Sequence, residues 1–314
     1  MSEKMATRQA YGQALAEFGE NPNIVVMDAD LSKSTNTASF QKKYPRRFIN
    51  TGIAEANMMS TAAGLAACGK TVFASSFAMF AAERAFEQVR NSIAYPRLNV
   101  KIGASHAGIT VGEDGATHQC LEDIALMRTL PGMVIINPAD ATEAKAAVKA
   151  AICHDGPVYL RLGRLAVPQI FDQNPAYHFE LGKGICIQDG TDVTIIATGL
   201  MVFEAIEAAR QLKEQGLSAR VLNIHTIKPL DRELVVKAAR ETGAIVTAEE
   251  HSVNGGLGSA VAETLAEEYP VPMCRIGVQD LFGRSGKPAE LMKWYHLTAE
   301  DIVEAAVKTA AKKG

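Results

Sequence analysis

Short apolar stretches that alternate with helical stretches constrain the fold of this chain more than any other feature. The expected strands are 24–28, 71–75, 99–103, 133–137 and 158–162, and the expected helices between them are 54–67, 81–93, 121–129 and 141–152. Asp140 directly precedes the last helix and Glu143 follows three residues later, which is typical of a helix N-terminus. This rhythm predicts a mostly parallel β-sheet covered by helices on both faces.

A second unit of the same type follows a stretch with weak periodicity. Residues 164–190 contain several prolines and glycines, which suits a connection between domains. The sequence then predicts strands at 193–197, 219–224 and 244–249 and helices at 202–215, 232–241 and 256–268. We therefore expect an α/β protein of two domains, each a mostly parallel sheet flanked by helices. The expected bounds are 1–168 for the first domain, 169–190 for the linker and 191–314 for the second domain.

Composition excludes several classes of function. The formal net charge of −3 offers no basic surface for nucleic acid, and no apolar run reaches the roughly 18 residues that a membrane helix needs. The first residues lack the apolar core of a signal peptide, so we expect a cytoplasmic location. The five cysteines include no Cys-x-x-Cys pair, so we expect reduced, mostly packed thiols that form neither disulfides nor a zinc site.

Residues 64–71 match the phosphate-binding loop of ATPases letter for letter. That loop binds phosphate only where a strand precedes it and a helix follows it, because the helix N-terminus then faces the phosphate. Here a predicted helix precedes the motif, Gly69 fits the glycine that ends this helix, and Thr71 begins a strand. We therefore interpret the segment as a turn and not as a nucleotide site.

The segment with the most chemical potential is Ser-His-Ala-Gly-Ile-Thr-Val-Gly-Glu-Asp-Gly-Ala-Thr-His-Gln, residues 105–119. It follows an expected strand, and α/β proteins bind their ligands in loops at the carboxyl ends of strands. Two histidines, His106 and His118, and two carboxylates, Glu113 and Asp114, stand among its glycines. We therefore expect functional residues in this loop.

This segment closely resembles the substrate loop of transketolase, a thiamine diphosphate enzyme, and the resemblance covers nearly the whole chain. It implies a pyrimidine-binding domain followed by the transketolase C-terminal domain. The implied activity is the transfer of a two-carbon ketol unit from a ketose phosphate to an aldose phosphate, a reaction of the pentose phosphate pathway.

One part of the family pattern is missing. The family's diphosphate-binding domain carries Gly-Asp-Gly followed at a fixed distance by Asn, which holds Mg²⁺, and no such pattern occurs here. The chain therefore resembles the C-terminal subunit of a split transketolase. We expect no metal ligand in this chain, activity only with a separate N-terminal subunit that binds Mg²⁺ and the diphosphate, and assembly as a heterotetramer.

The resemblance implies the cofactor-binding residues. Glu55, in Gly-Ile-Ala-Glu at the start of an apolar helix, matches the catalytic glutamate, whose carboxyl group bonds to the pyrimidine ring and promotes deprotonation of the thiazolium carbon. Simple compensation of the helix dipole is the alternative role of Glu55. Phe77 and Phe80 match aromatics that flank the pyrimidine, and Asp30 is expected to help hold the cofactor across the subunit interface. The family's third aromatic does not map cleanly; the residues nearest its position are Glu83, Arg84 and Phe86.

The resemblance also implies the substrate-binding residues. His106 and His118 match histidines of the substrate channel, with His118 expected to take part in catalysis, and Asp114 matches an aspartate that binds a sugar hydroxyl. The implied ligands of the sugar phosphate are Arg8, Ser34 and Arg164. Arginine suits phosphate because its planar fork makes two charge-assisted hydrogen bonds. Arg161 competes with Arg164 for this role, and Glu113 is expected to be a structural partner within the loop.

Three other interpretations stay open. The β subunit of a 2-oxoacid dehydrogenase has a similar length and domain order, but its loop would not carry Gly-Glu-Asp-Gly-Ala-Thr-His. A deoxyxylulose phosphate synthase shares similar wording but usually differs at the position of His106. A non-catalytic assembly subunit is the third interpretation, and the presence of Glu55, Asp114 and His118 argues against it.

Overall fold

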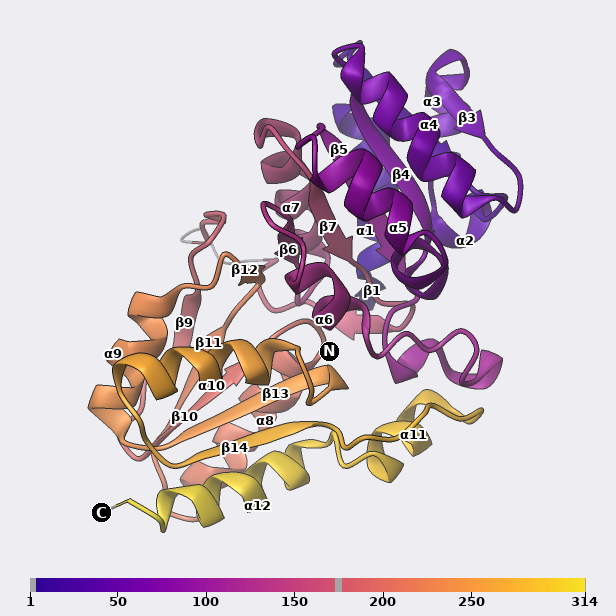
Figure 1. Cartoon of the computed structure of the whole chain (residues 1–314). Coiled ribbons are helices and arrows are strands. Elements are labelled where there is room, and N and C mark those ends of the chain that lie inside the picture. Colours follow the sequence, from indigo (N-terminus) through magenta and orange to yellow (C-terminus); the bar gives the residue numbers. More distant parts are fainter. Residues whose placement is uncertain (1–3, 173–176, 314) are drawn as a thin grey trace.

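The computed structural model describes residues 4–172 and 177–313, which form two layered α/β domains and one separate two-stranded sheet of residues 4–6 and 166–168 (Figure 1). The strands are β1 (Lys4–Ala6), β2 (Ile24–Asp28), β3 (Phe48–Asn50), β4 (Thr71–Phe77), β5 (Val100–Ser105), β6 (Val134–Ile136), β7 (Val158–Arg161), β8 (Ala166–Pro168), β9 (Ile185–Gln188), β10 (Val193–Ala197), β11 (Ala219–Asn223), β12 (Thr226–Lys228), β13 (Ile245–Ser252) and β14 (Met273–Val278). The α-helices are α1 (Thr7–Phe18), α2 (Ser32–Thr35), α3 (Ala38–Lys43), α4 (Glu55–Ala67), α5 (Phe86–Gln88), α6 (Asp123–Arg128), α7 (Ala141–Cys153), α8 (Met201–Glu214), α9 (Arg232–Thr242), α10 (Leu257–Glu268), α11 (Pro288–Trp294) and α12 (Ala299–Ala310). Also present are the 3-10 helices η1 (Pro45–Arg47) and η4 (Ile109–Asp114) and the π-helices η2 (Met79–Arg84) and η3 (Val89–Ala94).

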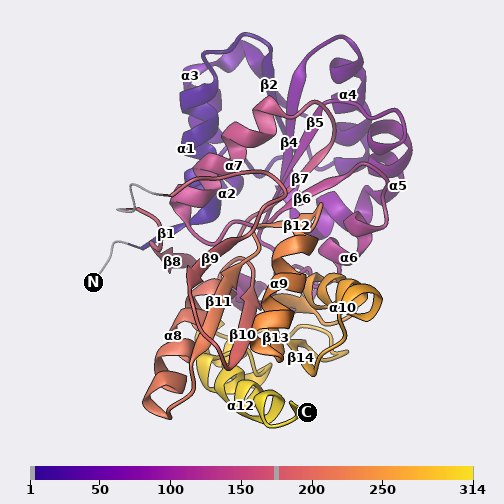
Figure 2. The ribbon, with the colours of Figure 1, turned by 90° about the vertical axis from the view of Figure 1, so that its left-hand side faces the viewer.

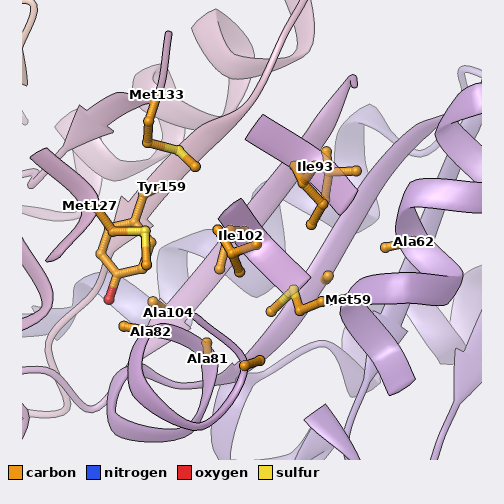
Figure 3. Packing of buried hydrophobic residues seen from close by; sticks show 14 of the residues in the cluster. Met59, Ala62, Ala81, Ala82, Ile93, Ile102, Ala104, Met127, Met133 and Tyr159 are labelled. Atoms are coloured by element: carbon orange, nitrogen blue, oxygen red, sulfur yellow. The ribbon is translucent and has the colours of Figure 1, made fainter. Parts of the chain in front are cut away.

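The seven-stranded sheet of the first domain has the order β12-β6-β7-β5-β4-β2-β3, and only β12 runs antiparallel to its neighbour. Side chains alternate between the two faces of a strand. In β2, Ile24 and Val26 therefore pack with α1 and α7, whereas Val25 and Met27 pack with α4 and the π-helices. Figure 3 shows this second layer, in which alanine and methionine side chains cover the middle of the sheet. The predicted parallel sheet with two covered faces is confirmed.

The five-stranded sheet of the second domain has the order β14-β13-β10-β11-β9, and only the edge strand β9 is antiparallel. In β10, Ile195 packs with α8 and α12, and Ile196 packs with α9 and α10 on the other face. Figure 2 shows these two helix pairs on opposite sides of the strands. The predicted α/β architecture of the second domain is confirmed as well.

One strand crosses between the domains. β12 follows β11 of the second sheet in the chain, yet it pairs with β6 at the edge of the first sheet. Next to this pairing, the backbone N–H of Asn137 donates to the carbonyl oxygen of His225 at 2.8 Å, and Thr198 Oγ1 donates to the carbonyl oxygen of Asn137 at 3.3 Å. The two domains are therefore joined by backbone hydrogen bonds.

The segment after β4 departs from the sequence prediction. The regular helix expected at 81–93 consists of the two π-helices η2 and η3, which short α5 joins. A π-turn holds more residues than an α-turn and often occurs at functional sites. The expected linker at 169–190 contains β9, which belongs to the second sheet, and its residues 173–176 lie outside the described residues.

The cysteine prediction is partly wrong. All five cysteines are free thiols, but Cys68, Cys153 and Cys186 are exposed, and only Cys120 is fully buried. The exposed ones lie at the ends of α4 and α7 and on the edge strand β9, where less of the chain covers them.

The motif at 64–71 has the expected order of elements. α4 ends at Ala67, Gly69 adopts a φ of 85°, and β4 begins at Thr71. A helix therefore precedes the turn and a strand follows it, the reverse of a phosphate-binding loop. Among the described residues, no helix is long and apolar enough to cross a bilayer.

Candidate active site

The expected site residues follow the carboxyl ends of four parallel strands. Ser34 comes after β2, Phe77 ends β4, His106 follows β5 and Arg164 follows β7. These strands are neighbours in the sheet, in the order β7-β5-β4-β2. The fold therefore brings residues that are far apart in the sequence to one edge, where α/β proteins bind ligands.

Glu55 is the first residue of α4, and its carboxyl group is buried, with 1% of the side chain exposed. Ser76 of β4 donates its hydroxyl to Glu55 Oε1 at 3.0 Å, and Nη1 of Arg84 in η2 donates to Oε2 at 3.0 Å. The N-terminus of α4 also favours negative charge at this position. A buried carboxyl group thus lies beside the end of β4, with one polar neighbour on each oxygen.

Four rings form a cluster beside this carboxyl group. Phe77 and Phe80 stack with their centroids 5.9 Å apart, and His106 stacks on Phe77 at 3.9 Å. His118 meets Phe80 edge-on at 5.5 Å. The structure therefore brings together the two aromatics and the two histidines that the sequence indicated separately.

Arg84 connects the ring cluster to Glu55. Its guanidinium carbon lies 4.5 Å from the centroid of Phe80 while Nη1 pairs with the glutamate, and about half of the side chain is exposed. The guanidinium of Arg84 therefore covers one face of Phe80 and occupies one carboxylate oxygen of Glu55. Phe86, the other aromatic near this position, packs against the core of the first domain.

His106 is held in an unusual conformation. Its φ of 57° lies in the left-handed region, which few residues other than glycine adopt. Its Nδ1 lies 3.0 Å from Ser105 Oγ. Burial, followed by the positive charges of Arg8 and Arg164 and the proximity of His118, lowers the pKa of His106 to about 3. The imidazole is therefore neutral at pH 7, with one nitrogen that donates and one that accepts a hydrogen bond.

Arg8 contacts both of the other residues expected at the sugar phosphate. Arg8 donates from Nη1 to the carbonyl oxygen of Ser34 at 2.5 Å and from Nε to the carbonyl oxygen of Arg164 at 3.5 Å. Arg164 donates to the carbonyl oxygen of Val111 and lies 3.6 Å from the carboxylate of Glu113. Burial, and secondly the charge of Arg164, lowers the pKa of Arg8. Two arginines therefore meet next to His106.

Buried Asp28 organises the turn that carries Ser34. Its carboxylate accepts hydrogen bonds from the backbone of Leu31 at 2.6 Å and from the hydroxyls of Thr35 and Thr37 at 2.7 and 2.9 Å. The sequence analysis did not identify this role, although an acidic residue at a strand end followed by several hydroxyl residues was a usable signal.

Arg161 belongs to a buried network instead of the surface of the site. Its side chain is 4% exposed, and Nε donates to the carboxylate of Asp123 at 2.9 Å. Its other amino group donates to the carbonyl oxygens of Glu250 at 2.9 Å and Cys120 at 3.4 Å. Arg164, which is partly exposed, is therefore the better placed of the two arginines for a phosphate.

Asp30 and Asp114 lie on exposed turns. Asp30 has a φ of 66°, and its backbone N–H and its side chain both bond to the side chain of Asn50. Asn50 ends β3, just before the loop that leads to Glu55. Asp114 is the exposed last residue of η4. The contacts of the chain neither place Asp114 in the ring cluster nor give it a bonded partner among the described residues.

Glu83, the residue before Arg84, faces Cys120 and Glu122 instead of Glu55. Ligand atoms of Glu83, Cys120 and Glu122 all lie within 4.8 Å of one another, and burial together with Glu122 raises the pKa of Glu83 to about 7. The sequence analysis did not bring these three residues together, because they come from η2 and from the turn before α6.

Comparisons with known proteins show the family to which this chain belongs. The family model of the transketolase pyrimidine binding domain matches residues 3–169, and that of the transketolase C-terminal domain matches residues 182–302. A putative transketolase C-terminal section of Methanocaldococcus jannaschii is 50% identical over 308 residues, which are 98% of this chain and 96% of that protein. The 6-deoxy-6-sulfo-D-fructose transketolase subunit SqwH of Clostridium sp. strain MSTE9 is 47% identical over 98% of this chain and 95% of that protein.

A solved structure described as a split gene transketolase in an inactive beta4 tetramer is also similar. It has a TM-score of 0.92 and 56% identity and covers 99% of this chain and 100% of its own. The chain therefore belongs to the transketolase family, whose enzymes are thiamine diphosphate-dependent transferases. Within that family it is a C-terminal subunit of the split type, because it covers 95% or more of these three proteins. The resemblance identified in the sequence is confirmed.

Proposed function

We propose that this subunit, together with a separate N-terminal subunit, transfers a two-carbon ketol unit from a ketose phosphate to an aldose phosphate. The observation that carries the proposal is the convergence at one sheet edge of a buried glutamate, a stacked aromatic pair, two histidines and two arginines. The first two features suit a flat cofactor ring, and the last two suit an anionic sugar.

The residues present fit the pyrimidine end of thiamine diphosphate. Glu55 offers a buried carboxyl group for a ring nitrogen, and Phe77 and Phe80 offer aromatic faces. Asp30, exposed on its turn, is assigned to the cofactor across the subunit interface. When bound, the cofactor supplies a nucleophilic carbon and takes up the negative charge of carbon–carbon cleavage. Glu55 holds or shares a proton at the ring nitrogen. Mg²⁺ and the diphosphate are assigned to the N-terminal subunit.

The histidines and Asp114 are assigned to the sugar. His106 is neutral at pH 7, so it can donate to or accept from a hydroxyl or carbonyl oxygen. His118, on the far side of the ring cluster, is assigned a role in proton transfer. Asp114, exposed in the same loop, is assigned to a sugar hydroxyl.

Arg8 and Arg164, with Ser34, are assigned to the anionic end of the sugar. Besides burial, the charge of Arg164 lowers the pKa of Arg8, and both arginines lower the pKa of His106, so two positive charges lie close together at the site. Charge-assisted hydrogen bonds to a phosphate favour such a pair. A sulfonate carries three oxygens in a similar arrangement, and one relative is described as acting on a sulfo-sugar. An assay of this subunit must therefore offer both phosphorylated and sulfonated ketoses.

The need for a partner is supported by the sequence and by one neighbour. The chain lacks the family's magnesium motif, and a similar split-gene subunit is described as inactive in a beta4 tetramer. We assign the active assembly as a heterotetramer of two subunits of each kind. The cytoplasmic location and the place in the pentose phosphate pathway stay predictions from the sequence.

Ketol transfer should be measured for the purified chain, for the purified N-terminal subunit, and for their mixture, each with thiamine diphosphate and Mg²⁺. We expect activity only in the mixture, because this chain binds only the pyrimidine end of the cofactor. Measurable transfer by the chain alone would refute the split-subunit proposal. Inactivity of the mixture with every phosphorylated and sulfonated ketose offered would refute the reaction.

A further inference from the structure

We propose that Gln119 is a positioning residue that holds the substrate loop in its active shape and attaches it to the second domain. The substrate loop is defined here as residues 106–119. The proposal rests on the function proposed above, because that function assigns His106, Asp114 and His118 of this loop to the substrate.

Gln119 closes the loop on itself. Its side chain is buried, with 2% of the residue exposed, and its amide nitrogen lies 3.1 Å from the carbonyl oxygens of both Ile109 and Gly112. These acceptors are ten and seven residues upstream in the same loop. One side chain thus connects the last residue of the loop to two points in its first half.

The loop between these contacts needs such support. η4 contains a break at Gly112, with a φ of 85° and a ψ of −121°, and Gly115 has a φ of 78°. Neither conformation is open to ordinary residues, and a break of this kind interrupts helical hydrogen bonds. Asp114 lies between the two glycines, and His118 is the neighbour of Gln119. The closure by Gln119 therefore fixes the stretch that carries both side chains.

The same amide group reaches the second domain. The amide nitrogen of Gln119 also donates to the carbonyl oxygen of Arg284 at 2.9 Å. A Cβ atom added at Gly283 would lie 2.0 Å from Gln119 Oε1, and one added at Gly115 would lie 2.4 Å from Ser285 Oγ. Residues 283–285, which follow β14, therefore lie directly against the loop. Helix α11 packs against η4 (Figure 1).

A second contact attaches the start of the loop to the same domain. Glu250, at the carboxyl end of β13, accepts a hydrogen bond from the backbone N–H of Thr110 at 2.6 Å. The glutamate fills the space beside Gly108, where an added Cβ would lie 2.3 Å from its carboxyl carbon. The second domain thus holds the loop at both ends.

The chemistry of this position requires an amide. All three acceptors are carbonyl oxygens, so a glutamate there would set a negative charge against them, and a methionine of similar size would offer no donor. Gln119→Met is therefore the principal variant. Gly283→Ala is the second variant, because it displaces the amide from outside while the loop sequence stays intact. Gln279→Met is the matched control, since Gln279 also donates to two backbone carbonyls, those of Arg275 and Gly277, away from the loop.

Each variant should be assayed as the complex with the N-terminal subunit. We expect Gln119→Met and Gly283→Ala to lower kcat/KM for ketol transfer by about tenfold to a hundredfold, the usual effect of a displacement of about 1 Å in a catalytic group. The affinity for thiamine diphosphate should stay within about twofold of wild type, because Glu55 and Phe80 lie on other elements. Gln279→Met should match wild type in both measurements.

Amide hydrogen exchange of the isolated chain gives a readout that is independent of activity. We expect faster exchange in residues 106–119 of Gln119→Met and Gly283→Ala and unchanged exchange in β4 and β5. Wild-type exchange in the loop of both variants would overturn the proposal, as would wild-type kcat/KM per folded complex. Uniformly faster exchange across the first domain would also overturn it, because that is the result of a purely structural role. If the wild-type complex shows no ketol transfer, the proposed function fails while the exchange result still decides the role of Gln119.

Discussion

The substitution Glu55→Gln separates catalysis from stability at this site. Glutamine is nearly isosteric with glutamate and keeps an oxygen that accepts the hydroxyl of Ser76. It loses the ion pair with Arg84, whose side chain is 51% exposed. A pair of this exposure is worth about 0–1 kcal/mol after solvent screening. A domain with roughly 5–15 kcal/mol of stability therefore stays more than about 99% folded in the variant.

The expected loss of turnover is much larger. A group that transfers or holds a proton in the transition state contributes about 10²–10⁴ in rate, so we expect kcat of the complex to fall by at least about 10² at saturating cofactor. Because unfolding removes about 1% of the protein at most, a loss of this size must come from the site itself.

Two measurements test this reasoning. Steady-state turnover of the complex should fall, and hydrogen–deuterium exchange at the thiazolium carbon of the bound cofactor should slow in parallel. Ser76→Ala is the matched control, since it removes the other hydrogen bond of Glu55 while the carboxyl group stays; we expect a loss of about tenfold or less, equal to one hydrogen bond. Wild-type exchange at the cofactor in Glu55→Gln would refute the assigned role.

Four further substitutions address other residues of the site. Arg8→Ala and Arg164→Ala should each raise KM for phosphorylated sugars by about 10- to 150-fold, since a charge-assisted bond is worth about 1.5–3 kcal/mol, while KM for hydroxypyruvate, which has no phosphate, should stay unchanged; an equal loss with both would contradict phosphate binding. Arg84→Ala removes the guanidinium that covers Phe80 and pairs with Glu55, two residues assigned to the cofactor ring. The cofactor then no longer has to displace an ion pair worth about 0–1 kcal/mol and a cation–π contact worth about 0.5–1 kcal/mol, so calorimetry of the complex should find thiamine diphosphate bound up to about 30-fold more tightly. Weaker binding would instead make Arg84 a ligand of the cofactor. For His106, the folded pKa of about 3 lies below the ordinary value of 6.5, so the unfolded chain binds the proton first and stability falls as pH drops through that window. Urea denaturation at pH 7 and pH 5 should show wild type losing about 2 kcal/mol more than His106→Asn, and equal losses would contradict a neutral buried imidazole.

The local rules of the sequence were sufficient for most of the scaffold. Apolar runs and helical periodicity placed the central strands of both sheets close to where the structure has them, because these signals depend on near neighbours. Asp140 accepts a hydrogen bond from the backbone of Glu143 at 2.8 Å, as its position before α7 predicted. The short strands β1, β3, β8, β9 and β12 were not predicted, because they are defined by their pairing partners and carry little pattern of their own. Edge strand β14 and helices α1, α11 and α12, near the two ends of the chain, were not predicted either.

The candidate site was only partly accessible in this way. The types and positions of Glu55, Phe77, Phe80 and the two histidines were recognisable, and the fold brings them together as expected. Arg84 was noted only as a residue near a missing aromatic, since its place over Phe80 depends on the π-helix that the periodicity did not reveal.

The sequence by itself determined the two-domain α/β class, because alternating apolar and helical stretches are local patterns. It also pointed to the family, because residues 105–119 form one contiguous motif, and the other site residues were identified through that resemblance. Only the tertiary structure decided which arginine is buried with Asp123 and which faces the site, and that Gln119 reaches Arg284 165 residues further along the chain. Such pairings arise when packing brings distant segments together, and each buried polar group must then find a partner among whatever side chains and carbonyls are there.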